Sequence, residues 1–451
     1  MSFEVMAPLM FVGLVLFLLL GYPVAFSLGA VGLLFGWIGV QYDFIQPVFL
    51  QNIPLRIFDT LKNQTLLAIP FFTFMGLILE RSGMAEELLD TVGQLFGRLR
   101  GGVAFAVILV GAVLAATTGV VAASVIAMGL ISLPVMLRHG YSPRVASGVI
   151  AASGTLAQII PPSLVLIIMA DQLGVSVGDM YRGAFVPGFI LTGLYLGYVV
   201  LISLINPKAV PGLPEEARTH RGSALAWRVL TVMIPPLVLI FLVLGTIFLG
   251  VATPTEGGAM GAVGALILAL ARRRLSLKVL IQAMEATARL TSFVTFILVG
   301  SRIFSLVFVG VDGDRWVENL LETALPDNPI AFLLIINLIV FLIAFFLDFF
   351  EIAFIIIPLI LPAVTGIMEG LYPEDYKIGL YWFGVMLGVN LQTSFMHPPF
   401  GFALFYLRSV APPSLKTSDI YWGAVPFVVI QVIMVLIVLF NPWLVTNWLA
   451  K

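Results

Sequence analysis

The chain has 451 residues, of which 60% are hydrophobic and 10% are charged, and its formal net charge is −1. Soluble domains carry about 25% charged residues, so this composition excludes an ordinary soluble protein and predicts one that lies in a lipid bilayer. A nearly neutral chain gives no reason to expect a nucleic-acid partner. Cysteine is absent, which excludes a disulfide framework, a thiolate metal site and a thiol nucleophile.

The first apolar segments are expected at residues 5–20, 24–40 and 66–79. Stretches of about 20 apolar residues can cross a bilayer as helices. No basic region precedes the first stretch, so we interpret it as a retained helix and not as a cleaved signal peptide. Residues 84–99 carry charges between leucines, a pattern that is typical of a helix lying in the membrane interface.

Residues 101–137 are apolar but are interrupted at Thr117, Thr118 and Gly119. The two halves on either side of this interruption are each short for a complete crossing of the bilayer. We therefore predict a re-entrant helical hairpin whose tip lies inside the membrane. The alternative is a single long, tilted helix.

A broken helix is predicted at residues 145–173, where Pro161 and Pro162 interrupt an apolar run. Two adjacent prolines remove two backbone donors and clash with the preceding turn. In hydrocarbon, the freed carbonyl groups are tolerated only where they are buried in protein or line a cavity. The break therefore marks a candidate binding site. A further span is expected at residues 184–205.

A hydrophilic segment at residues 207–228 lies in the middle of the chain and contains prolines and charged residues. It is the natural boundary between an N-terminal half, residues 1–206, and a C-terminal half, residues 229–451. Spans are expected directly after it at residues 229–249 and 260–271.

The C-terminal half repeats the order of the N-terminal half. Its expected parts are a span at 290–311, a second amphipathic segment, a hairpin at 330–361, a broken helix at 378–407 and a final span at 421–440. The second proline pair, Pro398 and Pro399, follows the first pair at a distance of 237 residues. Broken helices at matching places in two halves are typical of secondary transporters, so we predict an internal duplication.

The positive-inside rule predicts the orientation of the chain. The most basic connections, residues 206–228 and 272–278, are expected in the cytoplasm, and the acidic segment 312–327 is expected on the opposite side. The two hairpins then enter the membrane from opposite faces, so the two halves are inverted with respect to each other. Both termini are predicted to lie in the periplasm.

Polar residues gather at both breaks and both hairpin tips. Freed carbonyl groups, hydroxyls and amide oxygens bind Na⁺, and N–H groups at the start of a half-helix attract a carboxylate. In the first half, the candidates are Thr117, Thr118, Gly119 and Ser124 at the hairpin and Ser153, Gly154, Thr155, Pro161 and Ser163 at the break. The alternative role of the small residues is close packing between helices.

In the second half, the candidates are Asp348 at the hairpin and Asn390, Gln392, Thr393, Ser394 and His397 at the break. Asp348 either binds a cation or caps the second hairpin helix. His397 is either a substrate donor or proton carrier, or a structural histidine. No His-Glu-x-x-His pair and no phosphate-binding Gly-Lys-Ser/Thr loop occurs. We therefore predict no enzyme activity, no cofactor and no transition-metal site.

These motifs resemble the large membrane subunit of the tripartite ATP-independent periplasmic (TRAP) transporters over nearly the whole chain. The resemblance is carried by residues 117–134, 138–144, 154–163, 346–348 and 390–399. It implies an inverted-repeat, elevator-type secondary transporter in the inner membrane of a bacterium, where inward Na⁺ flow drives the uptake of an organic acid. It also implies two separate partner chains, a periplasmic substrate-binding protein and a small membrane subunit with four helices.

The resemblance also implies roles for the candidate residues. One Na⁺ site would contain Thr118, Gly119, Ser153, Gly154 and Thr155, and the other Asp348, Asn390, Thr393 and Ser394. The substrate would lie between the hairpin tips, beside Thr117, Ser124, Pro161, Ser163, Gln392 and His397. The chain departs from the family where Val120 and Val121 follow Gly119 in place of two serines, and where Ser394 and His397 replace a glycine and a threonine.

Other functions are compatible with the same pattern. A stand-alone cation-coupled carboxylate transporter with this architecture is the alternative to the TRAP subunit. A channel belongs to another class and would show conductance beyond the turnover of a carrier. An intramembrane enzyme would need a nucleophile and base or a metal centre, for which the chain offers few residues.

Overall fold

The computed structural model describes residues 3–217, 222–324, 328–398 and 401–449, without the side chains of Glu4, Thr117, Thr118, Ala217, Glu318 and 321–324. All regular structure in these ranges is helical. Within them, eight helices are long and apolar enough to cross a membrane, and a pair bent by 45° at residue 63 would make a ninth. The prediction of an all-α membrane protein with many spans is confirmed.

The first part of the chain runs from the N-terminus to the hydrophilic segment in the middle. Its helices are α1 (Met6–Leu19), α2 (Val24–Gln41), α3 (Pro47–Leu50), α4 (Asn52–Lys62), α5 (Ala68–Arg81), α6 (Met84–Phe96), α7 (Gly102–Thr118), α8 (Val121–Arg138), α9 (Pro143–Thr155), α10 (Leu164–Leu173) and α11 (Val177–Ile205).

The second part contains the remaining helices, two of which are preceded by a π-helical turn. They are α12 (Gly222–Arg228), α13 (Ile234–Phe248), α14 (Pro254–Ala271), α15 (Leu277–Gly310), α16 (Gly313–Ala324), α17 (Pro329–Ile343), α18 (Phe349–Glu351), α19 (Ile357–Leu371), α20 (Tyr376–Leu391), α21 (Phe402–Val410), α22 (Thr417–Phe440) and α23 (Trp443–Thr446).

The run from α5 to α11 and the run from α15 to α22 contain the same elements in the same order. In each run, an apolar helix is followed by an amphipathic helix, a hairpin, a broken helix and a long closing helix. The hairpins are α7–α8 and α17–α19, and the broken helices are α9–α10 and α20–α21. The division of the chain into two halves at residues 207–228 remains a prediction.

Several predicted helix boundaries were wrong, because apolar runs are shorter than the helices that contain them. Helix α15 begins at Leu277 and not at 290, α11 begins at Val177 and not at 184, and the second hairpin continues to Leu371 and not to 361. Backbone hydrogen bonds continue a helix past its apolar part, where the side chains are charged or polar. The helices α3 and α4 were not predicted.

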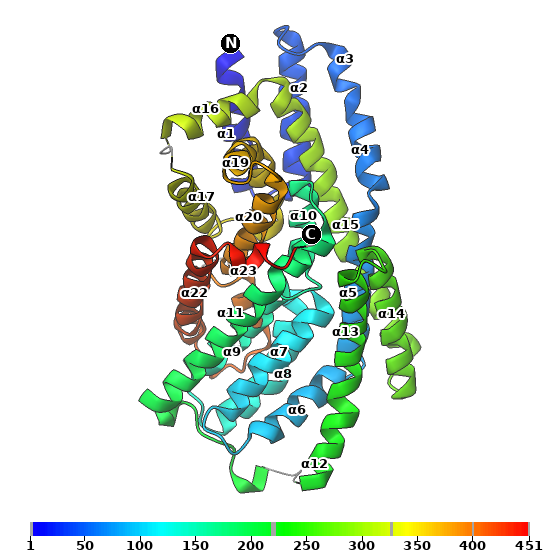
Figure 1. The fold of residues 1–451 in the computed structure, drawn as a ribbon, viewed down its shortest axis with the longest axis vertical. Helices are drawn as coiled ribbons and strands as arrows, with labels where there is room; N and C mark the ends of the chain where they lie inside the picture. Colours follow the sequence, from blue (N-terminus) through cyan, green and yellow to red (C-terminus); the bar gives the residue numbers. More distant parts are fainter. Residues whose placement is uncertain (1–2, 218–221, 325–327, 399–400, 450–451) are drawn as a thin grey trace.

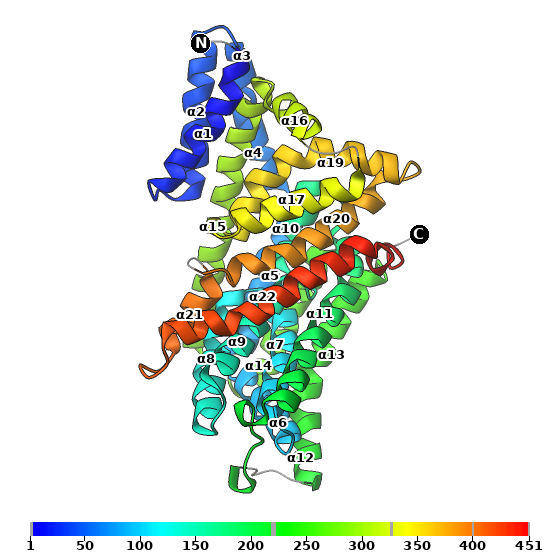
Figure 2. The same ribbon diagram turned by 90° about the vertical axis from the view of Figure 1, so that its left-hand side faces the viewer.

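The two hairpins approach the middle of the molecule from opposite ends (Figures 1 and 2). Helices α6 and α8 lie toward the end where α12 is found, whereas α16 and α17 lie in the part that contains the N-terminus. Elsewhere in the molecule, α9 packs on α22, α2 packs on α15, and α5 packs on α14. Residues of both hairpin tips line one cavity.

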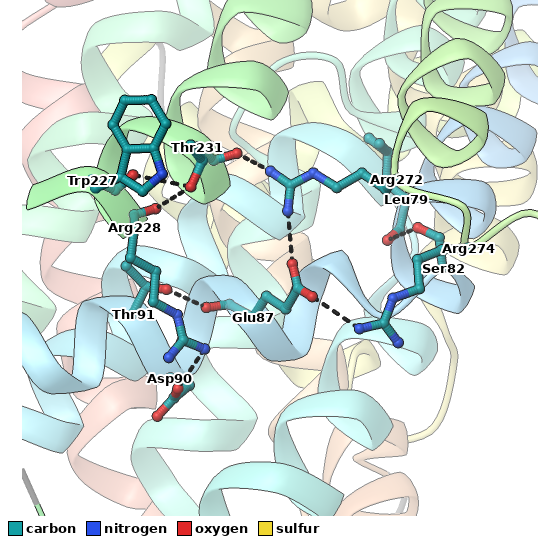
Figure 3. A network of polar contacts seen from close by, with 10 residues as sticks. All are labelled: Leu79, Ser82, Glu87, Asp90, Thr91, Trp227, Arg228, Thr231, Arg272 and Arg274. Carbon is teal, nitrogen blue, oxygen red and sulfur yellow. Dashed lines mark hydrogen bonds and ion pairs between the residues drawn. The ribbon is translucent and has the colours of Figure 1, made fainter. Parts of the chain in front are cut away.

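The amphipathic helix α6 is held by an ionic network (Figure 3). The carboxylate oxygens of Glu87 lie 2.8 Å from Arg272 and 3.1 Å from Arg274. One turn further along α6, Asp90 pairs with Arg228 at 2.7 Å. The two basic segments that were predicted to share one side of the membrane therefore lie against the same helix.

Replacing Glu87 by glutamine should lower the melting temperature of the purified protein by about 2–4 °C, because two arginines lose a partly buried partner. The loss should shrink in high salt, which screens the ion pairs. Glu86→Gln is the matched control, since Glu86 is exposed in the same first turn of α6. A circular-dichroism melt of each variant measures the effect. An equal loss in both variants would assign it to the helix dipole and contradict the role of the network.

Candidate functional site

A cavity of about 1180 Å³ lies where the two hairpin tips meet the two helix breaks. Residues 119–122 of the first tip and 348–351 of the second tip line it. The breaks contribute Gln158 and Leu164 in the first part of the chain and Phe395 and Phe402 in the second. The rest of the wall consists of Val165 and Tyr406, residues 22–26 at the start of α2, and residues between 286 and 296 of α15.

The first hairpin tip is built on Gly119, which ends α7 with a φ of +58°. Side chains rarely adopt this backbone conformation, whereas glycine adopts it without steric cost. A Cβ at Gly119 would lie 3.3 Å from Cγ of Leu164 and 3.5 Å from the carbonyl oxygen of Pro162, so the tip contacts the start of α10. Helices α7 and α8 pack against each other, which confirms the hairpin and shows that the alternative of one long helix was wrong.

The side chains of Thr117 and Thr118 lie outside the described part of the structure. Ser124 is buried on α8, and Pro161 is buried within the break. Ser163 caps α10, because its Oγ accepts a hydrogen bond from the N–H of Leu166 at 3.4 Å. The same hydroxyl donates to the carbonyl oxygen of Gln158 at 2.5 Å. The Ser163 hydroxyl therefore forms hydrogen bonds with backbone groups on both sides of the proline pair.

Ser153 and Gly154 lie where α9 contacts the first hairpin. The hydroxyl of Ser153 donates to the carbonyl oxygen of Val149 at 2.6 Å, and a Cβ at Gly111 of α7 would lie 2.6 Å from the Cβ of Ser153. A Cβ at Gly154 would lie 2.3 Å from Cγ2 of Val125 in α8. Both residues thus take part in close helix packing, and cation binding by Ser153 and Gly154 stays a prediction.

Thr155 and Gln392 join the two helix breaks. The two residues are 237 positions apart, like the proline pairs, and Oγ1 of Thr155 lies 3.5 Å from Oε1 of Gln392. Nε2 of Gln431 in α22 donates to Oγ1 of Thr155 at 3.3 Å and to the hydroxyl of Tyr195 at 2.9 Å. All four side chains are fully buried. The two breaks therefore meet in a buried polar network.

Asp348 caps the helix that begins at the second hairpin tip. Its Oδ1 accepts from the N–H of Glu351 at 2.9 Å, while Oε2 of Glu351 accepts from the N–H of Asp348 at 3.0 Å. This reciprocal arrangement is a capping box, and both carboxylates line the cavity. The capping role is thus present, and cation binding by Asp348 stays a prediction.

The remaining candidates of the second break are buried in α20 and the turn that follows it. Asn390 donates to the backbone carbonyl oxygen of Asn337 in α17 at 2.8 Å and to its side-chain oxygen at 3.0 Å. Thr393 and Ser394 each donate to a carbonyl oxygen three residues earlier, at 2.7 and 2.8 Å. Asn390 therefore attaches the broken helix to the second hairpin.

His397 is buried between aromatic rings of the second hairpin. Its ring stacks on Phe345 with centroids 4.0 Å apart and meets the edge of Phe341 at 4.5 Å. It is not among the residues that line the cavity, whereas Gly119 and Asp348 are. The roles of His397 and Gln392 as substrate ligands remain predictions.

Three polar parts of the site were missed from the sequence. Gln158 lies at the cavity wall, and its buried Oε1 has no hydrogen-bond partner among the described residues. Gln431 and Tyr195 complete the network at the breaks, and Arg289 of α15 lines the cavity. Gln158 precedes the first proline pair by only three residues and could have been included with Ser153, Gly154 and Thr155. The others lie on helices that carry no break.

The donor atoms near the breaks suit a hard, weakly bound cation. Within the described residues, no three His, Cys, Asp or Glu side chains gather as metal ligands. The groups present are hydroxyls, amide oxygens and backbone carbonyls, which are the ligands that bind Na⁺ at interrupted membrane helices.

The chain matches one family model over residues 11–444, described as the DctM component of the tripartite ATP-independent periplasmic transporters. It is 30% identical to the C4-dicarboxylate TRAP transporter large permease protein DctM of Pseudomonas aeruginosa, covering 90% of this chain and 91% of that protein. It is 26% identical to the 2,3-diketo-L-gulonate TRAP transporter large permease protein YiaN of Escherichia coli, over 98% of each chain.

Two further similarities extend these matches. The chain is 27% identical to the isethionate TRAP transporter permease protein DctMQ of Oleidesulfovibrio alaskensis, and the match covers 96% of this chain and 65% of that protein. Among solved structures, the YdaH transporter of Alcanivorax borkumensis shares the fold, with a TM-score of 0.58 at 15% identity over 89% of this chain and 90% of that chain.

Proposed function

The chain belongs to the DctM component family of the TRAP transporters, and we propose that it is the permease through which a binding-protein-dependent secondary transporter takes up an organic acid. Its relatives are transporter permeases and not enzymes. The names of three of them point to acids as cargo, namely C4-dicarboxylates, 2,3-diketo-L-gulonate and isethionate. The chain is a multi-pass membrane protein, and the proposed location is the bacterial inner membrane.

The cavity between the two hairpin tips is the observation that carries the proposal. Both runs of the chain line it, and each run contributes one tip and one break. Hairpins that enter from opposite ends allow one tip to open while the other stays closed, which is what alternating access requires. A permanently open channel has no need of two such tips.

The proposed mechanism is an elevator movement of a hairpin bundle, α7–α11 with α17–α22, against a scaffold, α1–α5 with α13–α15. The position of the cavity supports it, because the cavity lies at the boundary between these two groups of helices. A polar contact also crosses the boundary: Asp171, at the end of α10, contacts Asn63 and lies 3.9 Å from Arg302 of α15. Such a contact would break and reform during the movement.

The proposed coupling ion is Na⁺, held by oxygen atoms near the two breaks. The predicted first site contains Thr155, whose hydroxyl lies in the network that joins the breaks. A small, buried group of neutral oxygens binds Na⁺ without the cost of a fixed charge inside the membrane, which is at least about 2.5–3.5 kcal/mol. This chemistry supports Na⁺ over a transition metal.

Replacing Thr155 by valine should raise the Na⁺ concentration for half-maximal uptake by about tenfold, because one oxygen ligand worth about 1.4 kcal/mol is lost while the shape is kept. Thr393→Val should act in the same direction. The matched control is Thr192→Val, since Thr192 is also buried and donates to the carbonyl oxygen of Gly188, but lies on α11. Uptake measured against Na⁺ concentration is the test. An unchanged Na⁺ dependence in both site variants would remove these residues from the cation sites.

The proposed partners are a periplasmic binding protein and a small membrane subunit. The match to DctMQ leaves about a third of that relative outside the aligned part, which supports a separate small subunit for this chain. Proteoliposomes containing the chain and its small subunit, supplied with the binding protein, should accumulate an organic acid only when a Na⁺ gradient points inward. Uptake without the binding protein would favour the stand-alone transporter, and ion conductance beyond carrier turnover would favour a channel.

A further inference from the structure

The charged groups that face the cavity are unequal in number. One cationic side chain, Arg289 of α15, lines the cavity, together with the two carboxylates Asp348 and Glu351. Arg289 is exposed, and it takes part in none of the ion pairs among the described residues. The other polar groups of the wall are neutral, namely Gln158, Ser292, Tyr22 and Tyr406.

Aromatic rings form much of the remaining wall. On the side of the hairpins, rings follow one another with centroid distances between 3.8 and 6.4 Å, in the order Phe350, Phe349, Phe395, Phe402 and Tyr406. On the side of the scaffold, Phe26 meets Phe296 at 6.2 Å, and Phe293 meets Phe350 at 5.5 Å. Rings of both sides thus line the space, and the two sides meet where Phe293 contacts Phe350.

This wall fits one anionic group better than two. A single carboxylate can pair with Arg289 through two parallel hydrogen bonds. A second carboxylate on the same small molecule would lie among phenylalanine rings or beside Asp348 and Glu351. Burying a charge without a partner is strongly unfavourable, and like charges at close range repel.

The rings determine what the rest of the molecule should be. Aromatic side chains prefer to stack on, or meet edge-on, a flat apolar group. Ligand pockets for drug-sized molecules have volumes of about 300–1,000 Å³, so a cavity of about 1180 Å³ has room for a bulky body. A C4-dicarboxylate would fill little of this space and would offer the rings no flat apolar group to pack against.

We propose that the substrate of this cavity is a monoanionic carboxylate with an aromatic body, whose acid group pairs with Arg289 and whose ring packs among Phe349, Phe395 and Phe402. This inference rests on the proposed transport function of the same cavity. Under this proposal, Arg289 and the three rings determine the selectivity for an aromatic monocarboxylate over a C4-dicarboxylate.

The test is direct binding to the full chain in lipid nanodiscs, with radiolabelled phenylacetate, succinate and palmitate as probes. Phenylacetate should bind at least about tenfold more tightly than succinate, because only one of the acid groups of succinate finds a cation. Equal or tighter binding of succinate would overturn the proposal. Palmitate binding more tightly than phenylacetate would assign the cavity to lipid and would overturn it as well.

Variants connect the binding to the named residues. Arg289→Gln should weaken phenylacetate binding by about tenfold, and Phe395→Leu should weaken it by about fivefold. Lys278→Gln is the control for the charge, three turns earlier on α15, and Phe241→Leu is the control for the ring, on the exposed surface of α13. Both controls should bind like the unchanged protein. Melting temperatures identify a variant that is misfolded, and unchanged binding in folded Arg289→Gln and Phe395→Leu would overturn the proposal.

Uptake in proteoliposomes separates this inference from the function on which it rests. Na⁺-driven uptake of succinate without uptake of phenylacetate would leave the transport function intact and overturn the substrate class. Specific binding of phenylacetate without gradient-driven uptake of any acid would support the substrate class and overturn the transport function.

Discussion

Replacing Gly148 by leucine should reduce the yield of folded protein by at least about tenfold. Helices α9 and α22 approach closely at this residue, where a Cβ would lie 2.1 Å from the carbonyl oxygen of Gly423. The contact is reciprocal, because a Cβ at Gly423 would lie 2.2 Å from the carbonyl oxygen of Arg144. Overpacking of a core costs about 1–3 kcal/mol or more, and here the clash is with backbone that cannot rotate away.

The measurement is the height of the monodisperse peak in fluorescence-detected size-exclusion chromatography after extraction from membranes. Gly193→Leu is the matched control, since Gly193 lies in the long apolar helix α11 with no other atoms within 4 Å of its Cβ position. Its peak should equal that of the unchanged protein. Equal peaks for both variants would show that α9 and α22 do not need this close contact.

Replacing Gly119 by valine should reduce uptake by at least about tenfold while the protein still inserts and folds. The φ of +58° is strained for a β-branched residue by roughly 1–3 kcal/mol. The added side chain also has to enter the contact between the tip and Leu164. The first hairpin tip would then be displaced from the start of α10, and the cavity would lose part of its wall.

Gly174→Val separates backbone strain from this contact. Gly174 has a similar φ of +66° at the end of α10, but nothing lies within 4 Å of its Cβ position. Both variants should lose a similar amount of thermal stability, and only Gly119→Val should lose uptake, by at least about tenfold. If uptake fell equally in the two variants, strain alone would explain the loss, and the tip would have no special role in transport.

The sequence predicted the interruptions of the helices better than their lengths. Pro161 and Gly119 act on their own backbone, so their effects follow from local chemistry. The start of α15 at Leu277 could not be found in the same way, because its first turns carry polar side chains and resemble a loop.

The partners of the site residues were harder to predict than the site itself. Ser153 and Gly154 were correctly placed beside the first break, but their packing on Gly111 and Val125 depends on how α9 meets the first hairpin. Gln431 and Arg289 come from helices without breaks and are brought to the site only by the fold. Contacts between distant segments leave no periodic pattern in the sequence, and for this reason the aromatic wall was not predicted either.

The length and close packing of helix α15 predict how ionic strength changes the rates of substrate capture and release. It is unbroken over 34 residues, which corresponds to about 51 Å, and it meets the backbone of α2 closely, since a Cβ at Gly300 would lie 2.3 Å from the carbonyl oxygen of Ala25. In the proposed elevator movement, a straight helix held in this way would keep Arg289 stationary while the hairpins move. A substrate acid that pairs with Arg289, as proposed above, would be attracted by a fixed positive charge on arrival and would have to leave that charge on departure. Higher ionic strength should therefore slow the capture of substrate and speed its release.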